Sequence, residues 1–502
     1  MVELSLFSQK LPFGQQIKLA NGESIAINEI VRVLPNKRLV CKAVWQNQDI
    51  YAKLFIGVNA KRDAMRDEMG VQALMHANIA TPDLLYAGKI EAGGVLLFKA
   101  LNTAQNAEVL YLQLLTSQQK PARLQLMLQL TSMVAQMHNA NLQQTDLYLK
   151  NFLIEVDTVY AIDGDGIKPF SIFFKNHQKK RNLAVLFSKF DALDDGCLYQ
   201  CYVHYCKLTG ASYLVIDYAN IDYLTQKVRQ RAASRYADKK VFRNCTDVKV
   251  METFKQFKAL SRDFSVANLS EQELDDALNN TQNRLKSGNT CTVGVTSFNN
   301  QAVVIKRYNI KNFWHGLKLS IFQSRAAKSW ANAHWLMLLN VATAKPLALI
   351  EERFGCFKRR AYFLSEFMNA PDIAEFFTQT HDVPIKEKVA FETALLFYKL
   401  NILHISHGDC KASNIKIMNN KPVLIDLDSM QAHRFVGFST GWLILWWFEK
   451  KHVKDLKRFM QNWKHSLETS LIFKQAFIQV YDEKNDYLQP TILERAKIAS
   501  TS

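Results

Sequence analysis

The sequence predicts an α+β protein built from two tandem domains, 1–264 and 265–502, each with a small β-rich lobe followed by a helical lobe. Three observations lead to this prediction. A set of polar residues recurs in both halves of the chain at the same spacing. A segment that alternates like a β-hairpin precedes each set. Segments with the three- and four-residue periodicity of helices lie in both halves.

Composition and charge limit what the protein can be. Hydrophobic residues make up 48% and charged residues 22% of the 502 residues, which excludes a largely disordered chain. The net charge of +17 favours an anionic partner, such as nucleic acid, a membrane face or a phosphorylated substrate. The 8 cysteines include no CxxC pair, which indicates free thiols in a reducing cytosol.

The repeat consists of an Asp, an Asn and a second Asp, preceded by a strand that ends in a lysine. The Asn follows the first Asp by 5 residues, and the second Asp follows it by 17, in both halves. The members are Lys53, Asp146, Asn151 and Asp163 in the first half and Lys306, Asp409, Asn414 and Asp426 in the second. Recurrence in the same order and spacing indicates a duplicated domain. We place the division near residue 265, in the polar stretch SVANLSEQELDDALNNTQN.

The secondary structure around these residues follows from local patterns. The alternation of apolar residues, broken at Gln46-Asn47 and at Asn299-Asn300, predicts two hairpins. Helical periodicity predicts a helix after each hairpin and a long helix further along each half. The expected elements are hairpins at 38–56 and 291–308, strands at 93–101 and 360–368, and helices at 64–77, 123–138, 325–340 and 388–401.

In the second half, the repeated residues suit transfer of a phosphoryl group, which needs positioning and charge neutralisation more than covalent chemistry. Asp409 would orient the acceptor hydroxyl or take its proton, and Asn414 and Asp426 would supply oxygen ligands for magnesium. Lys306 would bind the phosphates of the nucleotide. Lys411 would offset charge on the phosphate that moves.

The first half offers the same set of groups. Asp146, Asn151, Asp163 and Lys53 would take the corresponding roles. Glu68 lies on the predicted helix, 15 residues after Lys53, where an ion pair with that lysine would fix it.

The motifs HGDCKASN and VLIDLD resemble the catalytic core of the protein-kinase-like fold. The set VVIKRYNI, SRAAKSWANAH, ALIEERFG, AYFLSEF, HGDCKASNI, VLIDLDSM and RFMQNW resembles the Kdo/WaaP-type lipopolysaccharide core kinases over most of residues 281–465. LPNKRLV, YAKLF, IATPDLLYAG and TDLYLKNFLI resemble the same family less closely. This resemblance implies two tandem protein-kinase-like domains, ATP and Mg²⁺ as cofactors, and phosphorylation of an inner-core sugar, Kdo or heptose. HGD motifs also occur in antibiotic and choline phosphotransferases, so the motif indicates the fold more strongly than the substrate.

Each half departs from the family pattern in its own way. In the first, Gln144 replaces the loop histidine and Tyr148 stands where the phosphate-neutralising lysine is expected. In the second, Lys306 has no acidic partner on the following helix, and Trp330 lies about where the glutamate is expected. Neither half has GxGxxG, and Gly288 is the only glycine at a plausible phosphate-binding loop.

Two other classes of function stay open. The first is a pseudokinase pair that binds lipopolysaccharide or scaffolds its assembly, and the second is a soluble small-molecule or protein kinase. The individual residues also have structural interpretations: Asp146 and Asp409 as helix caps, Lys53 and Lys306 as solvated strand ends, and Glu68 as an exposed helix charge. The duplicated spacing argues against the cap interpretation.

The apolar and basic segments, together with the family resemblance, predict where the protein works. The first residues lack the pattern of a signal peptide, and the longest apolar stretch, 435–448, is shorter than a spanning helix. The basic stretches Lys227–Arg243 and Lys450–Arg458 are either solvated faces or contacts for anionic lipid, and no nucleic-acid module accompanies them. The family resemblance implies a substrate at the cytoplasmic face of the bacterial inner membrane. We therefore expect a cytoplasmic protein, peripheral on that face, with added contacts from Trp442, Trp446 and Trp447 if these are exposed.

Overall fold

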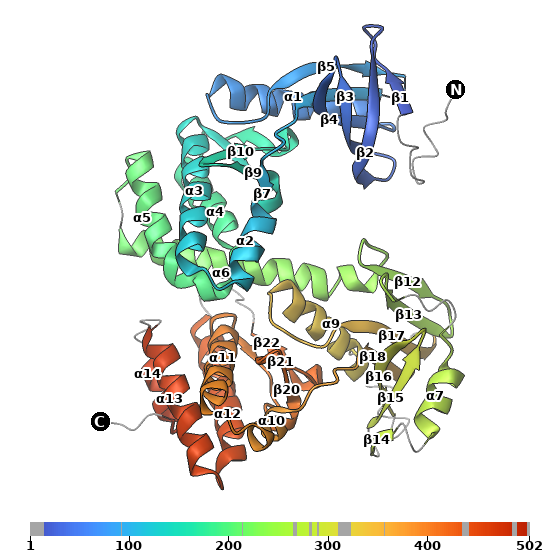
Figure 1. Ribbon diagram of the computed structural model, residues 1–502, viewed down its shortest axis with the longest axis vertical. Coiled ribbons are helices and arrows are strands. Elements are labelled where there is room, and N and C mark those ends of the chain that lie inside the picture. Colours follow the sequence, from blue (N-terminus) through green and yellow to red (C-terminus); the bar gives the residue numbers. More distant parts are fainter. Residues whose placement is uncertain are drawn as a thin grey trace. The chain divides into compact units, whose positions relative to one another are not determined.

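The computed structural model describes residues 15–91, 93–212, 214–264, 269–280, 284–288, 291–309, 323–355, 357–433, 441–483 and 489–498. It divides into two compact units. The first unit comprises residues up to Phe190 and Asp194–Thr225, and the second comprises Asp191–Leu193 and the chain from Gln226 onward. Each unit has one lobe built on an antiparallel sheet and one built mainly of helices (Figure 1). The predicted α+β fold with two tandem copies is confirmed.

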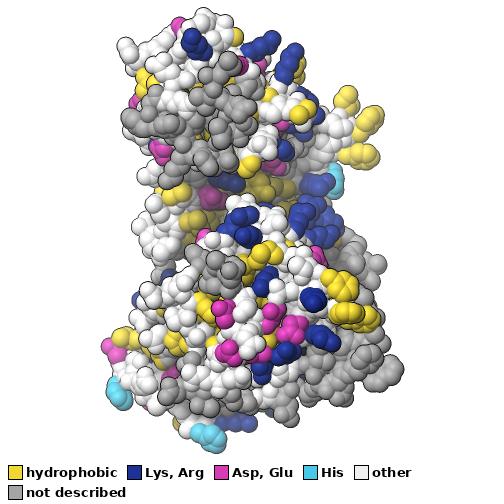
Figure 2. Space-filling view, turned by 90° about the vertical axis from the view of Figure 1, so that its right-hand side faces the viewer, with side chains coloured by type: hydrophobic (Ala, Val, Ile, Leu, Met, Phe, Trp, Pro, Cys, Tyr) yellow, Lys and Arg dark blue, Asp and Glu magenta, His cyan; other side chains and the backbone are white. Residues whose placement is uncertain are grey.

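Charged and apolar side chains share the surface. On the face shown in Figure 2, Lys and Arg side chains lie in groups, as the net charge of +17 leads one to expect. Among the described helices, none is both long enough and apolar enough to cross a membrane. Part of the apolar stretch 435–448 lies outside the described residues, and the helix that includes the rest begins at Gly441.

The sheet lobe of the first unit has six strands in the order β1-β2-β3-β4-β6-β5, with one helix beside it. Gln46 and Asn47 turn the central hairpin with φ values of 52° and 58°, the geometry preferred in two-residue hairpin loops. Because strand side chains alternate, Leu96 and Phe98 pack with the helix while Val95 and Leu97 belong to the core on the opposite face. The elements are β1 (Gln15–Lys18), β2 (Ser24–Leu34), β3 (Arg38–Trp45), β4 (Gln48–Ile56), α1 (Ala60–His76), β5 (Leu84–Ile90) and β6 (Gly93–Lys99).

The helical lobe of the first unit is centred on one long buried helix with Pro121 in its first turn, where proline is tolerated. Its residues pack with neighbouring helices, and the rings of Tyr111 and Phe190 lie 5.5 Å apart in the same core. The elements are β7 (Gln105–Asn106), α2 (Ala107–Thr116), α3 (Lys120–Asn139), β8 (Leu142–Gln144), β9 (Phe152–Glu155), β10 (Thr158–Ala161), β11 (Ile167–Pro169), α4 (Lys175–Phe187), α5 (Leu198–Thr209) and the beginning of α6 (Val215–Ala237).

The sheet lobe of the second unit has seven strands in the order β12-β13-β17-β18-β16-β15-β14. Asn299 and Asn300 turn its hairpin with φ values of 47° and 62°, as predicted from the sequence. The elements are β12 (Val248–Glu252), β13 (Gln256–Ser261), α7 (Glu271–Asn279), β14 (Arg284–Ser287), β15 (Cys291–Phe298), β16 (Gln301–Tyr308), α9 (Arg325–Leu338), β17 (Pro346–Phe354) and β18 (Phe357–Glu366).

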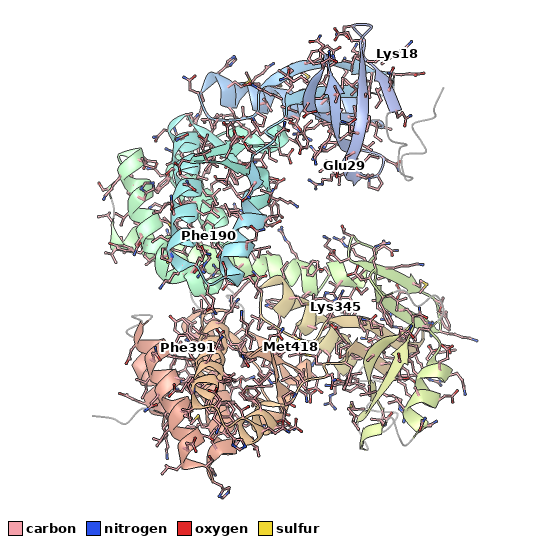
Figure 3. All side chains as sticks on the ribbon, viewed as in Figure 1. Lys18, Glu29, Phe190, Lys345, Phe391 and Met418 are labelled. Carbon is pink, nitrogen blue, oxygen red and sulfur yellow. The ribbon has the colours of Figure 1, made fainter. Side chains whose placement is uncertain are left out.

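The helical lobe of the second unit is built around α11 (Val383–Ile402), which carries the predicted helix at 388–401. Phe391 lies on this helix and is partly buried against the core (Figure 3). The other elements are α10 (Ile373–Gln379), β19 (Ile405–Ser406), β20 (Ile415–Met418), β21 (Lys421–Leu424), β22 (Gln431–Ala432), α12 (Gly441–Met460), α13 (Leu467–Glu483) and α14 (Gln489–Arg495).

The division between the units differs from the one predicted near residue 265. Strand β13 pairs with β17, from Gln256 opposite Glu352 to Leu260 opposite Ala348, so it belongs to the second sheet. Residues 226–264 are therefore part of the second unit. The sequence did not reveal this pairing because β17, which begins at Pro346, lies far along the chain from β13. The residue pattern of a strand does not indicate which other strand it pairs with.

Candidate active site

In the second unit, the loop after β19 forms one closed turn between Asp409 and Asn414. The side-chain amide of Asn414 donates a 2.8 Å hydrogen bond to the backbone oxygen of Asp409 and a 3.3 Å bond to its Oδ2. Backbone N–H groups of Lys411 and Asn414 close the turn from inside. Because the amide nitrogen of Asn414 is used within the loop, its amide oxygen is turned away from Asp409.

Groups outside the motif hold this loop in place. Asp455 of α12 is 3% exposed and accepts hydrogen bonds from the N–H groups of His407 (2.7 Å) and Gly408 (3.0 Å). Burial raises the pKa of Asp455, although these N–H groups oppose the rise. His407 Nε2 lies 3.1 Å from the backbone oxygen of Ile425, which agrees with the structural role expected for this histidine. Gly408 has a φ of 81°, and a Cβ there would lie 2.6 Å from the oxygen of Ser429.

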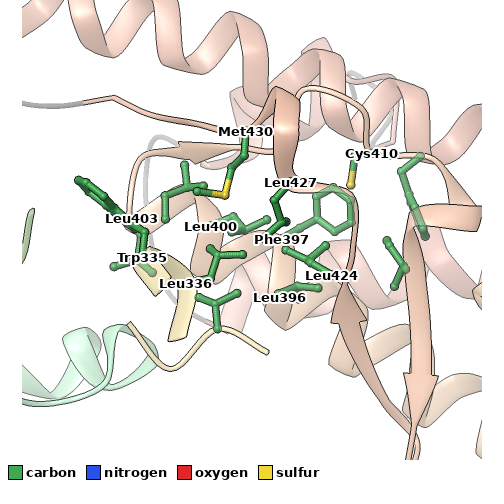
Figure 4. Packing of buried hydrophobic residues seen from close by; sticks show 14 of the residues in the cluster. Trp335, Leu336, Leu396, Phe397, Leu400, Leu403, Cys410, Leu424, Leu427 and Met430 are labelled. Carbon is green, nitrogen blue, oxygen red and sulfur yellow. The ribbon is translucent and has the colours of Figure 1, made fainter. Parts of the chain in front are cut away.

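The loop also rests on the apolar core of the second unit. Cys410 is 1% exposed, and Figure 4 shows it in the same cluster as Phe397, Leu424 and Leu427. Burial raises the pKa of the Cys410 thiol well above its usual value. This side chain is therefore an apolar anchor in the loop between Asp409 and Asn414.

Asp426 follows β21 and lies beside the loop. Its φ of 62° is unusual for a residue other than glycine and starts a short 3₁₀ turn. Lys306 Nζ on β16 lies 3.0 Å from Asp426 Oδ1. Burial alone would raise the pKa of Asp426, but Lys306 outweighs this effect and the pKa is lowered. The backbone N–H of Ile425 donates to the oxygen of Asn414, which sets Asp426 next to that residue.

Two cationic side chains contact the Asp409 carboxylate. Lys411 Nζ lies 3.6 Å from Oδ2 of Asp409, so Lys411 lies beside Asp409, as its position two residues later in the motif led us to expect. Arg458 Nη2, on α12, lies 2.5 Å from Oδ1 and was not predicted as a site residue. Arg458 follows Asp455 by three residues, so both lie on one face of the helix. The three-residue spacing between Asp455 and Arg458, at the end of the basic stretch, was the sequence signal that could have identified Arg458.

Gly288 lies directly after β14, in the connection from β14 to β15. Strand β15 in turn pairs with β16, the strand that carries Lys306. A Cβ at Gly288 would lie 3.2 Å from the backbone oxygen of Cys291, so the chain approaches closely there. Strand β15 pairs Val293 with Lys306. The following residues of LKSGNT lie outside the described residues.

The first unit repeats the backbone of this loop. Asn151 Nδ2 donates a 2.8 Å hydrogen bond to the backbone oxygen of Asp146, and Asp163 has a φ of 76°. Gln144 Nε2 donates to the oxygen of Ile162 at 3.2 Å, the contact that histidine makes in the second unit. The departure at Gln144 therefore preserves the structural contact.

Tyr148 stands where the second unit has a lysine, yet lysines lie near it. The ammonium groups of Lys150 and Lys189 lie 5.0 and 4.4 Å from the centre of the Tyr148 ring. Burial lowers the pKa of Lys189, and the charge of Asp146 partly opposes this. Lys189, from another part of the chain, thus interacts electrostatically with Asp146.

The ion pair predicted for Glu68 is made by its neighbour Asp67. Lys53 Nζ lies 3.0 and 2.9 Å from the two carboxylate oxygens of Asp67, which is fully buried. Glu68 instead accepts a hydrogen bond from Gln72, one turn further along α1. The prediction was wrong because one residue rotates a side chain by about 100° around a helix, and spacing from Lys53 does not fix that phase.

Arg38 joins the same cluster and was also missed. Its Nη1 lies 3.1 Å from Asp163 Oδ1 and 3.3 Å from Asp67 Oδ2, while Lys53 Nζ lies 3.7 Å from Asp163 Oδ1. Burial alone would raise the pKa of Asp163, but Lys53 and Arg38 outweigh it and the pKa is lowered. A cavity of about 470 Å³ opens beside these residues.

A family comparison bears on both sites. The model of the lipopolysaccharide kinase (Kdo/WaaP) family matches residues 51–204 and 276–458. The chain belongs to this family. The family resemblance is thereby confirmed, and the protein is a member of a kinase family that acts on lipopolysaccharide. No curated protein matches the sequence significantly. A solved structure titled "Structure of vaccinia related kinase 3" is similar at 12% identity and a TM-score of 0.26, covering 48% of this chain and 79% of that one, and carries no further argument.

Within the Kdo/WaaP family pattern, α9 supplies no carboxylate to Lys306. Trp330 is fully buried, and its indole N–H donates to the oxygen of Val241 at 3.2 Å, so it is a core residue. The neighbouring Ser329 contacts the hydroxyl of Tyr308 at 3.2 Å. In the described part of the second unit, Asp426 is the acidic partner of Lys306.

The donors present decide where the magnesium expected for the Kdo/WaaP family fits. In the described residues no cluster of three or more His, Cys, Asp or Glu forms a metal site. Magnesium in phosphoryl-transfer sites needs only one or two protein ligands besides phosphates and water. Asn414 and Asp426 meet this need in the second unit. In the first, Asp163 already pairs with two cations, and the residues present do not fit a divalent ion.

Proposed function

We infer that the protein transfers the γ-phosphoryl group of ATP to a hydroxyl of an inner-core sugar of lipopolysaccharide, Kdo or heptose, in its second unit. The observation that carries this proposal is the grouping of Asp409, Asn414, Asp426 and Lys306 in a member of the Kdo/WaaP family. These groups come from a loop, a strand end and a second lobe. Such a grouping supplies positioning and charge neutralisation, the two requirements of phosphoryl transfer.

The residues have distinct roles in this proposal. Asp409 takes the proton of the sugar hydroxyl. The hydroxyl oxygen bonds to the γ-phosphorus, and the bond between that phosphorus and the β–γ bridging oxygen breaks, which releases ADP. Lys306 binds the phosphates, and Lys411 offsets charge on the group in transfer. Asn414 and Asp426 would hold Mg²⁺, which neutralises phosphate charge when bound.

Mass spectrometry of core oligosaccharide from a deletion strain tests this function. We expect loss of one phosphate, restored by the wild-type chain and not by Lys306→Ala. Lys345→Ala is the matched control, since Lys345 lies in the same lobe but pairs with Asp263 at the surface (Figure 3). An unchanged phosphate count in the deletion strain would remove this proposal and favour a pseudokinase pair or a kinase with a soluble substrate.

The proposed site of action is the cytoplasmic face of the inner membrane, which the protein reaches as a peripheral protein. On α12, Trp446 and Trp447 are 42% and 56% exposed, and Lys450 Nζ lies 3.4 Å from the centre of the Trp446 ring. Paired tryptophan and lysine side chains suit a membrane interface. Within Lys227–Arg243, Arg229 is buried, so only part of that stretch can face a membrane.

A second apolar group in the first unit also supports membrane contact. Ile172, Phe173 and Phe174 are 91%, 75% and 80% exposed, and Lys175 begins the basic helix α4 directly after them. Figure 2 shows projecting hydrophobic side chains next to Lys and Arg on the surface. Three large apolar side chains beside basic ones match an anionic lipid surface.

Flotation with vesicles tests this location. We expect binding to anionic vesicles at low salt and about tenfold weaker binding at high salt, because charges near a surface are screened. Ser at all three positions 172–174, or at 446 and 447, should weaken binding. Binding that ignores lipid charge and salt would make the basic stretches ordinary solvated faces, and no binding would favour a soluble substrate.

A further inference from the structure

One strand position of the small lobe is charged in the first unit and uncharged in the second. In β3, Val40 is paired with Lys53, and Arg38 is paired with Phe55 two residues further on. In β15, Val293 is paired with Lys306, and Cys291 is paired with Tyr308. The register therefore makes Cys291 the counterpart of Arg38. This correspondence lies outside the repeated motif.

Arg38 places a positive charge beside Asp163, the second motif aspartate of the first unit. Its side chain is 12% exposed and reaches both Asp163 and Asp67 within 3.3 Å. Together with Lys53 it sets two fixed positive charges against two carboxylates. A divalent cation that approached Asp163 would meet this fixed positive charge at close range. In the second unit Cys291 is an uncharged neighbour, and burial raises the pKa of its thiol.

The cavity beside this cluster carries an excess of cations. Arg32, Lys99 and Lys150 line it in addition to Arg38 and Lys53, and among the described residues of the lining Asp163 is the one that is acidic. Apolar side chains line it as well, among them Val40, Phe98, Leu153 and Ile162. The combination fits a ligand with a flat apolar part and several negative charges. At about 470 Å³ the cavity has the size of a small-ligand site.

We propose that the first unit binds a nucleoside triphosphate in this cavity without a divalent cation, with Arg38 supplying the positive charge that magnesium supplies elsewhere. A guanidinium presents a planar set of donors that matches phosphate oxygens. Free nucleotide is also more negative than its magnesium complex, which favours it in a cavity with five basic residues. This inference concerns binding only and does not depend on transfer in the second unit.

Calorimetric titration of the full chain with ATP tests the proposal through stoichiometry. In excess EDTA we expect one bound nucleotide, held by the first unit. In excess Mg²⁺ we expect the second unit to bind the magnesium complex and binding in the first unit to weaken, because little free nucleotide remains. Lys306→Ala should remove the magnesium-dependent site and leave the metal-free one. Binding in that variant that strengthens more than tenfold with Mg²⁺, or no nucleotide binding in EDTA, would overturn the proposal.

Exchange of the two counterpart residues sharpens the test. Arg38→Cys should weaken binding in EDTA about tenfold, the effect of losing a charge-assisted contact, and Arg38→Lys should weaken it less. The reciprocal Cys291→Arg should reduce the dependence of second-unit binding on Mg²⁺. Thermal unfolding checks that each variant folds. If Arg38→Cys folds and binds as the wild type does in EDTA, Arg38 does not supply the charge. Loss of phosphate transfer in cells is a separate readout and bears only on the proposed function.

Discussion

The two units carry the same loop in different electrostatic surroundings. In both, an asparagine amide donates a 2.8 Å hydrogen bond to the backbone oxygen of the aspartate five residues earlier. In both, an arginine pairs with the Asp two residues after the second motif aspartate, Arg66 with Asp165 and Arg325 with Asp428. The units differ in the groups that face the carboxylates. Motif spacing thus fixes the backbone of a site, and residues outside the motif fix its charge.

The contrast is clearest at the second motif aspartate. Asp163 in the first unit has Lys53 and Arg38 as neighbours, whereas in the described part of the second unit Lys306 is the basic residue paired with Asp426. The first unit also has a buried Asp67 that holds both of its cations. In the first unit these ion pairs already balance the charge of Asp163, which disfavours an added cation there.

The largest expected effect separates the units by activity. Asp409→Ala should lower phosphoryl transfer by about 10³-fold, equivalent to about 4 kcal/mol, because the group that orients the hydroxyl is lost. Asp146→Ala, the matched change, should leave most of the activity. Transfer by the purified variants is the measurement. Equal loss from both would show that the first site also works or that the two are coupled, and loss from Asp146→Ala alone would reverse the assignment.

A second prediction tests the closed ion-pair cluster of the first unit. Asp67→Asn should lower its free energy of unfolding by about 3 kcal/mol, because two largely buried cations lose a carboxylate partner. Glu68→Gln should change it by less than about 0.5 kcal/mol, since Glu68 accepts an exposed hydrogen bond from Gln72 that a glutamine can also accept. Denaturant unfolding measures both. Similar effects of the two changes would contradict the helical phase found here.

The third prediction concerns how each loop is held. In the second unit the N–H groups of His407 and Gly408 donate to Asp455, whereas in the first the N–H of Thr145 donates to the backbone oxygen of Gly166. Asp455→Asn should therefore cost about 2 kcal/mol of stability and lower transfer as the loop loosens. Asp482→Asn, on α13, is a control for an acidic helix residue. Unchanged activity and stability in Asp455→Asn would mean that the loop holds itself.

The smallest loss of stability is expected for His407→Gln, because the first unit has a glutamine, Gln144, at the corresponding position. His407→Gln should cost about 1 kcal/mol or less, because Gln144 makes the same contact to a backbone oxygen in the first unit. His407→Ala should cost more, since the oxygen of Ile425 then loses its partner and the buried ring is lost. Thermal unfolding ranks the two. A larger loss from glutamine than from alanine would show that the contacts are not equivalent.

The sequence predicted the fold and the turn between Asp409 and Asn414 because the relevant information was local. Hairpin turns at Gln46-Asn47 and Asn299-Asn300, the helices after them, and the turn between Asp409 and Asn414 depend on residues close in the chain. It failed where the partner lay far away. The pairing of β13 with β17 moved the domain division, and Arg38, Asp67, Asp455 and Arg458 were not predicted as site residues.

The amino-acid sequence by itself determined that there are two copies of one fold and which loop carries the Asp and Asn. Tertiary structure alone decided what faces each carboxylate. A strand register sets Arg38, and not a neighbour, beside Asp163, and the phase of α12 turns Asp455 and Arg458 to one loop. Hydrogen bonds within a turn follow from spacing along the chain, whereas electrostatic partners follow from distance in space, and only packing fixes that distance.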